Sequence, residues 1–262
     1  MKFMDWFKSL FKKNRTAPAP APTPAPAPAP VPAPVTKAPT FVETFQNLDN
    51  WIVSTWEAPG ANASHSGTFV ASNVTCGPDG LRLALTQTKP GSTVLSVGGE
   101  VASKQKFGYG RYEFVVRASS TGATAYADGS PVSGSITGCF NYTNASQTEI
   151  DIEVEGNERS RTTQCTTWVG ENNPNQHTDV TPPSSVGLPH MRFFKYAFVW
   201  SPGKVEFYRD DALIATHTKV VPSAPAPMMF NHWGTNSVNW GGLATLDVTR
   251  YMYVKSFTFT PL

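Results

Sequence analysis

Residues 148–157 of the protein read "TEIDIEVEGN", in which charged and apolar side chains alternate along most of the segment. Of the 19 Asp and Glu in 262 residues, four occupy every second position here: Glu149, Asp151, Glu153 and Glu155. The apolar positions between them are Ile150, Ile152 and Val154. Because successive side chains of a β-strand point to opposite faces, the segment predicts a strand with its aliphatic residues in a core and its acids on the other face.

A row of like charges on one strand face costs stability, so the four acids need a reason to be there. Three uses fit: a metal site, a charge ladder neutralised by basic residues on neighbouring strands, or a catalytic carboxylate pair. We favour catalysis, because a straight strand wraps a metal ion poorly and Arg and Lys are sparse near this segment. Hydrolysis of a glycoside needs one ionised and one protonated carboxyl group, which two neighbouring acids can provide.

The spacing of these acids does not by itself decide the stereochemistry of such a reaction. Glu149 and Glu153 lie about 13 Å apart along an extended backbone. A retaining pair needs its carboxyl groups about 5–5.5 Å apart. Strand curvature and side chains that lean toward each other would have to close most of that gap.

The rest of residues 41–262 predicts a single all-β domain. Short segments rich in Val, Phe, Tyr and Thr recur between clusters of Gly, Pro, Asn and Asp, as is typical of strands. We expect strands at residues 81–88, 110–119, 135–143, 148–156, 162–170, 194–201, 204–210 and 254–261. So many short strands indicate a two-sheet sandwich or jelly roll.

The composition limits the classes of partner and of covalent cross-link. Charged residues make up 15% of the chain and the formal net charge is +2, which argues against a nucleic-acid partner. The number of Cys residues is odd, so we expect Cys76, Cys139 and Cys165 to be buried or free thiols. The sequence contains no run of 18 apolar residues that would span a membrane.

The N-terminal 40 residues differ from the rest of the chain. Residues 16–40 alternate Pro and Ala and predict an extended, semi-rigid linker. Residues 1–15 set apolar side chains against Lys and Arg with helical periodicity, which fits a basic amphipathic segment that contacts a membrane surface or a protein partner. The same residues also fit a disordered leader or an atypical export signal, although no small-residue cleavage site follows them.

The acidic strand also carries a family resemblance. "EIDIE" (149–153) resembles the active-site strand of glycoside hydrolase family 16, and "FGYGRYEFVVRAS" (107–119) is similar to the strand before the catalytic hairpin of bacterial licheninases. "CFNYTN" (139–144), "YAFVWSPGKVEFYRDDALIATH" (196–217) and "PMMFNHWGTNSVNW" (227–240) follow in the order that this family shows. The resemblance covers most of residues 41–262.

The resemblance implies a curved, concanavalin A-like jelly roll with a substrate cleft on its concave sheet. It implies retaining endo-hydrolysis of a β-glucan, with Glu149 as nucleophile, Glu153 as general acid/base and Asp151 assisting between them. Only one residue, Ile152, separates Asp151 from Glu153, whereas laminarinase-like members carry one more residue there. The shorter spacing favours a mixed-linkage β-1,3-1,4-glucan as the substrate. The substrate-binding residues that it implies are Glu113, on the strand adjacent to the acidic one, with Phe140, Tyr142, Trp168, Asn231, Trp233 and Trp240.

Three features depart from the family pattern. Residues 120–135 form a longer insertion, which we expect at the rim of the cleft. Glu155 replaces an apolar residue and adds a charge beside the acid/base. Met252 stands where many members place an Asp that binds structural calcium, so we expect a calcium ion to lack its usual ligand here, and no cofactor to be required.

The leading hypothesis is an endo-acting β-glucan hydrolase. A laminarin-type or algal galactan hydrolase and a transglycosylase are alternatives within the enzyme class. Outside it, the alternatives are a non-catalytic carbohydrate-binding module and a structural or adhesive surface protein. A binding module, however, has no use for three charge-strained acids. Because the cytosol holds little polysaccharide to cut, we expect the domain to act extracellularly or at the cell surface, as a monomer.

Overall fold

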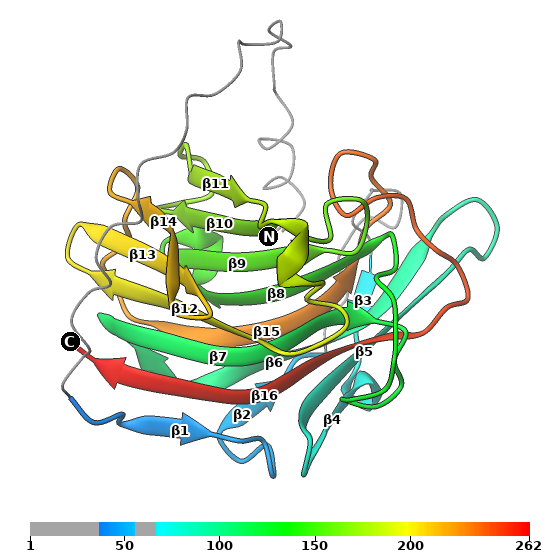
Figure 1. Cartoon of the computed structure of the whole chain (residues 1–262), viewed down its shortest axis with the longest axis horizontal. Coiled ribbons are helices and arrows are strands. Elements are labelled where there is room, and N and C mark those ends of the chain that lie inside the picture. The colour runs from blue at the N-terminus through cyan, green and yellow to red at the C-terminus, as the bar shows by residue number, and fades with distance from the viewer. Residues whose placement is uncertain (1–36, 56–66) are drawn as a thin grey trace, which may run out of the picture.

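The computed structural model describes residues 37–55 and 67–262, and their regular structure is almost entirely β (Figure 1). The amphipathic segment 1–15 and most of the linker lie outside the described residues. Three single-turn 3-10 helices, η3 (Ala71–Asn73), η4 (Asn144–Ser146) and η5 (Ser184–Val186), are the helical elements of the described part. The all-β prediction is therefore confirmed.

The strands form two layers. One layer has the order β11 (Gln176–Val180), β10 (Thr163–Trp168), β9 (Glu149–Glu155), β8 (Ser135–Tyr142), β15 (Ala226–Gly234) and β6 (Leu95–Phe107). The other has the order β5 (Gly80–Thr88), β16 (Arg250–Pro261), β7 (Gly110–Ser120), β12 (Phe194–Ser201), β13 (Lys204–Arg209) and β14 (Ala212–His217). The short strands β1 (Phe41–Glu43), β2 (Trp51–Val53), β3 (Gly67–Phe69) and β4 (Val74–Gly77) pair at the sides.

The two layers are halves of one curved sheet. Hydrogen bonding continues from one half to the other where β5 pairs with β6, and nearly all strand pairs are antiparallel. At the opposite side, the Thr178 hydroxyl on β11 and the His217 ring on β14 lie 3.0 Å apart in a hydrogen bond. The sheet is therefore nearly closed on itself, which is the jelly-roll sandwich that the sequence predicts.

Aromatic and aliphatic side chains fill the space between the halves. Ile150, Ile152 and Val154 of β9 are all buried in this core, as their alternation with the acids requires. Trp200, Phe198 and Phe207 are fully buried as well. Because three consecutive inward positions of β9 are packed, the opposite face of β9 is held in a fixed orientation.

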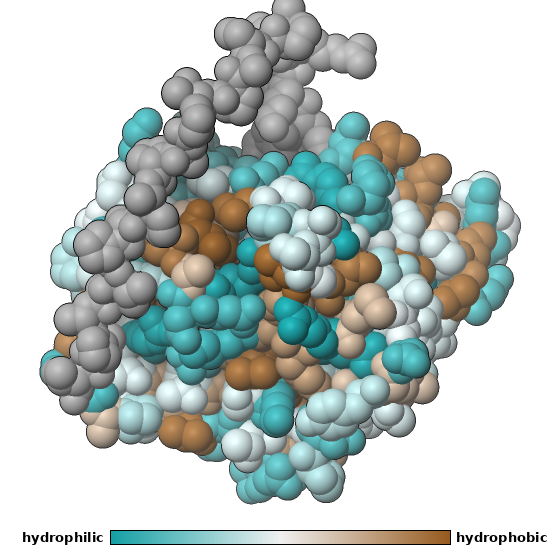
Figure 2. Space-filling model, viewed as in Figure 1, coloured by the Kyte–Doolittle hydropathy of each residue, from teal (hydrophilic) through white to brown (hydrophobic). Residues whose placement is uncertain are grey.

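The three Cys residues are free thiols. Cys139 and Cys165 are buried in the core and Cys76 is partly exposed, as the sequence indicated. Among the described residues, none of the helices has the length and hydropathy of a membrane span. On the face in Figure 2, hydrophobic residues appear as small patches between hydrophilic ones, the usual mixture on a protein surface.

Two long strands are missing from the sequence prediction, β6 and β15. In β6, "LSVGGEVASKQKF", two Gly residues and three charged residues break the apolar alternation. In β15, "APMMFNHWG", a Pro and two adjacent Met hide the period of two. Both strands pair on both sides, so tertiary hydrogen bonding decides their conformation where propensity does not.

His232 on β15 has a structural role. Its ring is fully buried, with Nδ1 2.9 Å from the Leu83 carbonyl and Nε2 2.8 Å from the Ser119 hydroxyl. Burial lowers the pKa of His232 from 6.5 to about 3. The unfolded chain therefore binds a proton at mildly acidic pH that the folded chain does not bind, and the stability that depends on neutral His232 is lost as pH falls below 6.5.

We expect the substitution His232→Gln to flatten this acid response. For wild type, the contribution of His232 to the free energy of unfolding falls by about 1.4 kcal/mol for each pH unit below 6.5. Urea unfolding at pH 7 and pH 5 measures the free energy of unfolding of both proteins. The variant should be less stable than wild type by a larger amount at pH 7 than at pH 5. Equal deficits at both pH values would contradict the assignment.

Candidate active site

The acids of β9 lie on the side of the sheet turned away from the core, which we call the catalytic face. The strand pairs in unbroken register with β8 on one side and β10 on the other. Residues directly opposite in an antiparallel pair share a face. The neighbours of each acid on the catalytic face follow from this register.

Each acid of the trio Glu149, Asp151 and Glu153 has one neighbour on each adjacent strand. Glu149 lies between Tyr142 and Trp168, Asp151 between Phe140 and Thr166, and Glu153 between Gly138 and Gln164. Glu149 and Asp151 are each 4% exposed, and Glu153 is half-buried. The trio is thus recessed between aromatic rings at one end and small or polar groups at the other.

The neighbours of the three carboxyl groups differ in their effects. Ser146 and Asp151 lower the pKa of Glu149, against the larger effect of its burial. Trp168 lowers the pKa of Asp151, whereas burial and the charges of Glu149 and Glu153 raise it. For Glu153, burial and then the charges of Glu149 and Glu155 all raise the pKa.

Burial raises the pKa of all three carboxyl groups above their usual range, and mutual repulsion adds to the shift. The pKa values of Glu149 and Glu153 both rise to about 8. Three carboxylates this close cannot all be ionised at neutral pH, so the trio retains at least one proton. A proton held at neutral pH is what a general acid needs.

The fourth acid, Glu155, belongs to a different environment on the same strand face. Its side chain is fully buried, accepts hydrogen bonds from Asn157 Nδ2 at 2.9 Å and from the Gly241 N–H at 2.6 Å, and forms an ion pair with Arg159 Nε at 3.1 Å. It also accepts a hydrogen bond from Gln164 Nε2. The charge of Glu155 is therefore neutralised and hydrogen-bonded, but by Arg159 of the turn after β9 and not by a basic residue of a neighbouring strand as in a charge ladder.

The predicted aromatic residues lie on the catalytic face. Phe140 and Tyr142 come from β8, Trp168 from β10 and Trp233 from β15, while Trp240 belongs to the loop after β15. The rings of Trp233 and Trp240 pack with centroids 4.5 Å apart. Trp168 is 2% exposed and Trp240 is 6% exposed, whereas Phe140, Tyr142 and Trp233 are half-buried and present more of their rings.

Asn231 of β15 reaches the trio across β8. It lies directly opposite Gly138, which in turn lies opposite Glu153. A Cβ on Gly138 would come within 2.2 Å of Asn231 Oδ1, so only Gly leaves room for the Asn231 side chain there. Asn231 Nδ2 donates to Glu100 Oε2 at 3.2 Å, while its buried Oδ1 accepts no hydrogen bond from the described residues. Asn231 thus offers an acceptor beside Glu153.

With this geometry established, the chain can be compared with known proteins. The family model "Glycosyl hydrolases family 16" matches residues 61–250. The chain belongs to glycoside hydrolase family 16. It is therefore a glycoside hydrolase.

Individual relatives agree with the family match. The chain is similar to a beta-glucanase of Paenibacillus polymyxa, with 30% identity over 198 residues that cover 72% of this chain and 75% of that protein. Among solved structures it is similar to Bacillus licheniformis beta-glucanase, with a TM-score of 0.71 and 25% identity over 86% of this chain and 99% of that one. The laminarinase catalytic domain of Thermotoga maritima MSB8 shares the fold, with a TM-score of 0.70 at 14% identity over 86% and 98% of the two chains.

The expected position of Glu113 is wrong. The strands adjacent to β9 are β8 and β10, whereas Glu113 lies on β7 in the other half of the sheet. Its neighbours Tyr112 and Phe114 are buried in the core, so Glu113 points outward, where Arg111 Nη2 binds it at 2.9 Å. Alternation along β7 turns this residue away from the catalytic face of the family 16 domain.

Four residues of the catalytic face were not found from the sequence. Glu100 lies opposite Asn231 on the unpredicted strand β6 and accepts from the Ser54 hydroxyl at 2.7 Å. Ser146 reaches Glu149 from the turn η4, in which Ala145 and Ser146 both have positive φ. Gln164 and Thr166 follow from the β9–β10 register, so a residue-by-residue pairing of the two predicted strands could have found them.

The insertion 120–135 has two parts with different positions. Gly134 N–H donates to the Gly241 carbonyl at 2.7 Å and Ser133 Oγ donates to the Leu243 carbonyl at 2.8 Å, so the second part supports the loop that carries Trp240. The first part packs on the other half of the sheet, where the carbonyls of Thr124 and Ala125 accept from Arg117. Only the second part borders the catalytic face.

The described residues do not fit the calcium site of the family at the position of Met252. This side chain is fully buried in the hydrophobic core on β16 and carries no oxygen ligand. Within residues 37–55 and 67–262, no group of three or more His, Cys, Asp and Glu side chains is arranged to hold a metal ion.

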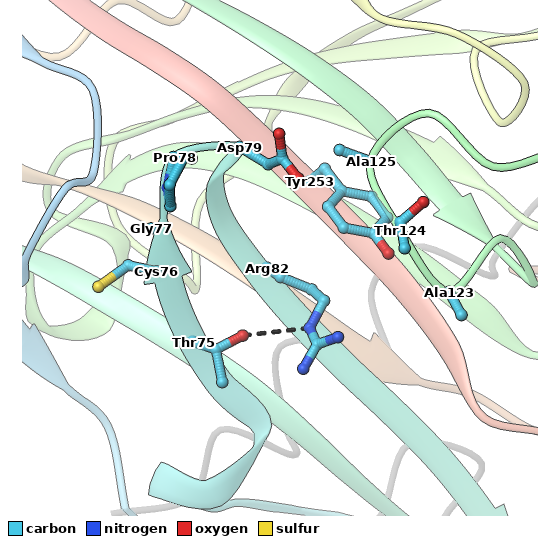
Figure 3. Close-up of a pocket in the computed structure, with 11 residues that line it drawn as sticks. Thr75, Cys76, Gly77, Pro78, Asp79, Arg82, Ala123, Thr124, Ala125 and Tyr253 are labelled. Atoms are coloured by element: carbon cyan, nitrogen blue, oxygen red, sulfur yellow. Dashed lines mark hydrogen bonds between the residues drawn. The ribbon is translucent and has the colours of Figure 1, made fainter.

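A pocket of about 220 Å³ lies away from the trio (Figure 3). Its walls come from β4, β5 and β16 and from residues 123–125 of the insertion, all in or beside the half of the sheet opposite β9. Arg82 Nε donates to the Thr75 hydroxyl at 3.1 Å across it, as the dashed line in Figure 3 marks. None of the trio lines this pocket, so it is separate from the candidate active site.

The close approach at Gly138 leads to a testable prediction. In Gly138→Ala the new methyl group displaces Asn231, and we expect the kcat/KM for glycan hydrolysis to fall by about 100-fold, as for other small displacements in active sites. Gly77→Ala is the matched control, because a Cβ at Gly77 meets nothing within 4 Å. Wild-type kcat/KM in Gly138→Ala would show that Asn231 does not need its present position.

The raised pKa values predict that the trio weakens the fold. The folded chain binds more protons than the unfolded chain between pH 4.5 and about 8, so the contribution of the trio to stability falls as pH rises through that window. We expect Glu149→Gln to raise Tm at pH 8 by about 2–4 °C, with the gain vanishing at pH 5, while hydrolysis is lost.

Glu113→Gln serves as the control for this experiment, because it removes a carboxylate from the outer face. We expect it to give no gain in Tm and to leave hydrolysis intact. Calorimetric scans at the two pH values measure both variants. A lower Tm for Glu149→Gln than for wild type at pH 8 would contradict the assignment of repulsion within the trio.

Proposed function

We propose that the protein hydrolyses internal bonds of a β-glucan with retention of configuration, preferring a mixed-linkage β-1,3-1,4-glucan. In this proposal Glu149 is the nucleophile and Glu153 is the general acid/base. Asp151 orients Glu149 and favours its ionised form. The observation that carries the proposal is the recessed trio of carboxyl groups side by side on the catalytic face of β9, which retains at least one proton at neutral pH. Ser146 and Asp151 lower the pKa of Glu149, whereas the neighbouring charges only raise that of Glu153.

The roles follow from the two protonation states. Asp151 lowers the pKa of Glu149, while Glu149 raises the pKa of Asp151. In this proposal Asp151 therefore holds the proton of the pair, and Glu149 is the carboxylate that a nucleophile must be. Glu153, which is raised by burial and by neighbouring charges, keeps its proton and can give it to the leaving glycosidic oxygen.

The two steps of the proposed reaction, glycosylation and deglycosylation of the enzyme, proceed without a cofactor. Glu149 attacks the anomeric carbon while Glu153 protonates the departing sugar, which leaves a covalent glycosyl-enzyme. Glu153, now ionised, takes a proton from water, and the hydroxide formed releases the glycan from Glu149. Asn231 Oδ1 accepts a hydrogen bond from a sugar hydroxyl beside Glu153, because this buried oxygen otherwise lacks a donor.

The preference for mixed linkage is supported by the unbroken register of β9. The pairs from Tyr142 opposite Glu149 to Ile136 opposite Glu155 run without a shift, so the strand has no bulge before Glu153. This continuity is the feature that the sequence associates with licheninases, and the relatives from P. polymyxa and B. licheniformis carry the name beta-glucanase. Hydrolysis of a β-1,3-glucan such as laminarin is the second candidate.

The substrate can be tested with the full-length chain. Barley β-glucan and lichenan should be cut to short oligosaccharides, with laminarin cut more slowly, and product anomers followed by NMR should first appear in the β form. Faster hydrolysis of laminarin than of lichenan would overturn the linkage preference. Binding to these glucans without any product would overturn the catalytic proposal.

Chemical rescue can test the two roles separately. With an aryl β-glycoside and azide, Glu149→Ala should form an α-glycosyl azide, because azide takes the place of the nucleophile in a single displacement. Under the same conditions Glu153→Ala should form the β-glycosyl azide after two displacements. The opposite pair of products would exchange the roles of Glu149 and Glu153.

The setting of this activity is part of the proposal. A polymeric glucan is met outside the cell, so the domain acts extracellularly or at the cell surface. The basic segment 1–15 and the Pro/Ala linker 16–40 would hold it near a membrane surface or a partner protein. Deleting residues 1–36 should leave hydrolysis of soluble glucan intact and reduce only the attachment of the domain to a membrane surface or a partner protein.

A further inference from the structure

Glu155 connects the catalytic strand to an aromatic wall. Glu155 accepts a hydrogen bond at 2.6 Å from the Gly241 N–H, which belongs to the Trp240 loop, residues 235–242. Its second partner Gln164 turns its carbonyl oxygen to Trp240 Nε1, which donates at 3.2 Å. The carboxylate therefore holds the backbone of the loop directly and the Trp240 ring through one intermediate side chain.

The same carboxylate also secures the strands beside the loop. Arg159 binds Glu155 through Nε at 3.1 Å and Asp179 of β11 through Nη2 at 2.8 Å. Asn157 Nδ2 adds a donor at 2.9 Å. Each oxygen of Glu155 thus receives two donors, and Glu155 is fully buried, so no other residue type satisfies all four donors.

The loop needs this anchor because its backbone is unusual. Gly241 and Gly242 have φ of 72° and 84°, and a Cβ at Gly241 would come within 2.1 Å of Thr235 Cγ2. Trp240 packs on Trp233, which is half-buried on the catalytic face. On β9, Glu155 comes two residues after Glu153 on the same face, so the ring pair lies beyond the acid/base.

We propose that Glu155 is a positioning residue that fixes the Trp240–Trp233 ring pair as the wall on which a substrate sugar ring stacks beyond Glu153. This inference rests on the proposed glucan hydrolysis. Glu155 does not touch the reacting atoms, so it governs binding of the polymer and not the chemical step. Aromatic faces suit this use because they cover the apolar side of a pyranose ring.

The central variant is Glu155→Gln, which nearly preserves volume and removes the charge. One of its two terminal atoms becomes an NH₂ group that faces donors, so the Trp240 loop loses at least one anchor. Gln164→Met cuts only the link to the Trp240 ring and leaves the Gly241 bond in place. This second variant decides the outcome if Glu155→Gln does not fold.

Glu43→Gln is the matched control. Glu43 is another buried carboxylate that accepts from a backbone N–H (Phe45, 2.7 Å), an Asn amide (Asn50, 3.2 Å) and a Trp indole (Trp51, 3.1 Å). It lies on β1, away from the catalytic face. A general effect of losing a buried carboxylate would appear equally in this control.

Two measurements distinguish a positioning role of Glu155 from a general effect on the stability of the fold. The indoles of Trp233 and Trp240 are close enough to couple, so we expect an exciton band pair in circular dichroism that Trp240→Phe identifies by its loss. Glu155→Gln and Gln164→Met should weaken this band pair, and Glu43→Gln should not. On a long glucan, Glu155→Gln should raise KM about tenfold, as loss of one stacked ring does, and leave kcat within about twofold.

The outcomes distinguish this inference from the proposed function. A wild-type band pair together with wild-type KM in both variants would overturn the positioning role, and so would a fall in kcat at unchanged KM. If wild type cuts no glucan, the proposed function fails, and the band pair alone still decides whether Glu155 positions the Trp240 loop.

Discussion

Packing of one face of β9 into the core is the constraint on which the active site depends. Ile150, Ile152 and Val154 are held between the halves of the sheet, so the backbone of β9 cannot rotate to carry its acids away from one another. Burial of each aliphatic side chain stabilises the fold by about 1.5–3 kcal/mol. That contribution offsets the repulsion among Glu149, Asp151 and Glu153, which share the opposite face.

The buried acids of β9 lie in two different environments. Glu155 is neutralised by Arg159 and surrounded by donors, so it behaves as an anchor. For the trio, no basic residue of the described chain is among the causes of the pKa shifts, and burial and mutual repulsion favour the protonated forms. In the proposed mechanism this absence matters, because a carboxyl group without a fixed counter-ion can exchange its proton with a substrate.

Much of this architecture is predictable because it depends on local pattern. The strands that alternate cleanly, such as β7, β9 and β12, appear close to their expected residues. The aromatic residues on β8 and β10 follow, because register places them beside the acids. Prediction fails at β6, whose Gly and charged residues conceal the period of two, and Glu100 is lost with it. Glu113 was misplaced because adjacency in sequence does not give adjacency in the sheet: β7 pairs with β12 and β16.

The sequence alone determined the acidic strand, its inward and outward faces, the all-β class and the resemblance to family 16, since each of these depends on residues close together in the chain. Only the tertiary structure decided the surroundings of each acid. Ser146, from a turn with positive φ, lowers the pKa of Glu149, and Glu155 acquires the Gly241 N–H from a loop 86 positions along the chain. Burial and long-range hydrogen bonds set the charge of a carboxyl group, and neither can be read from the spacing of acids along a strand.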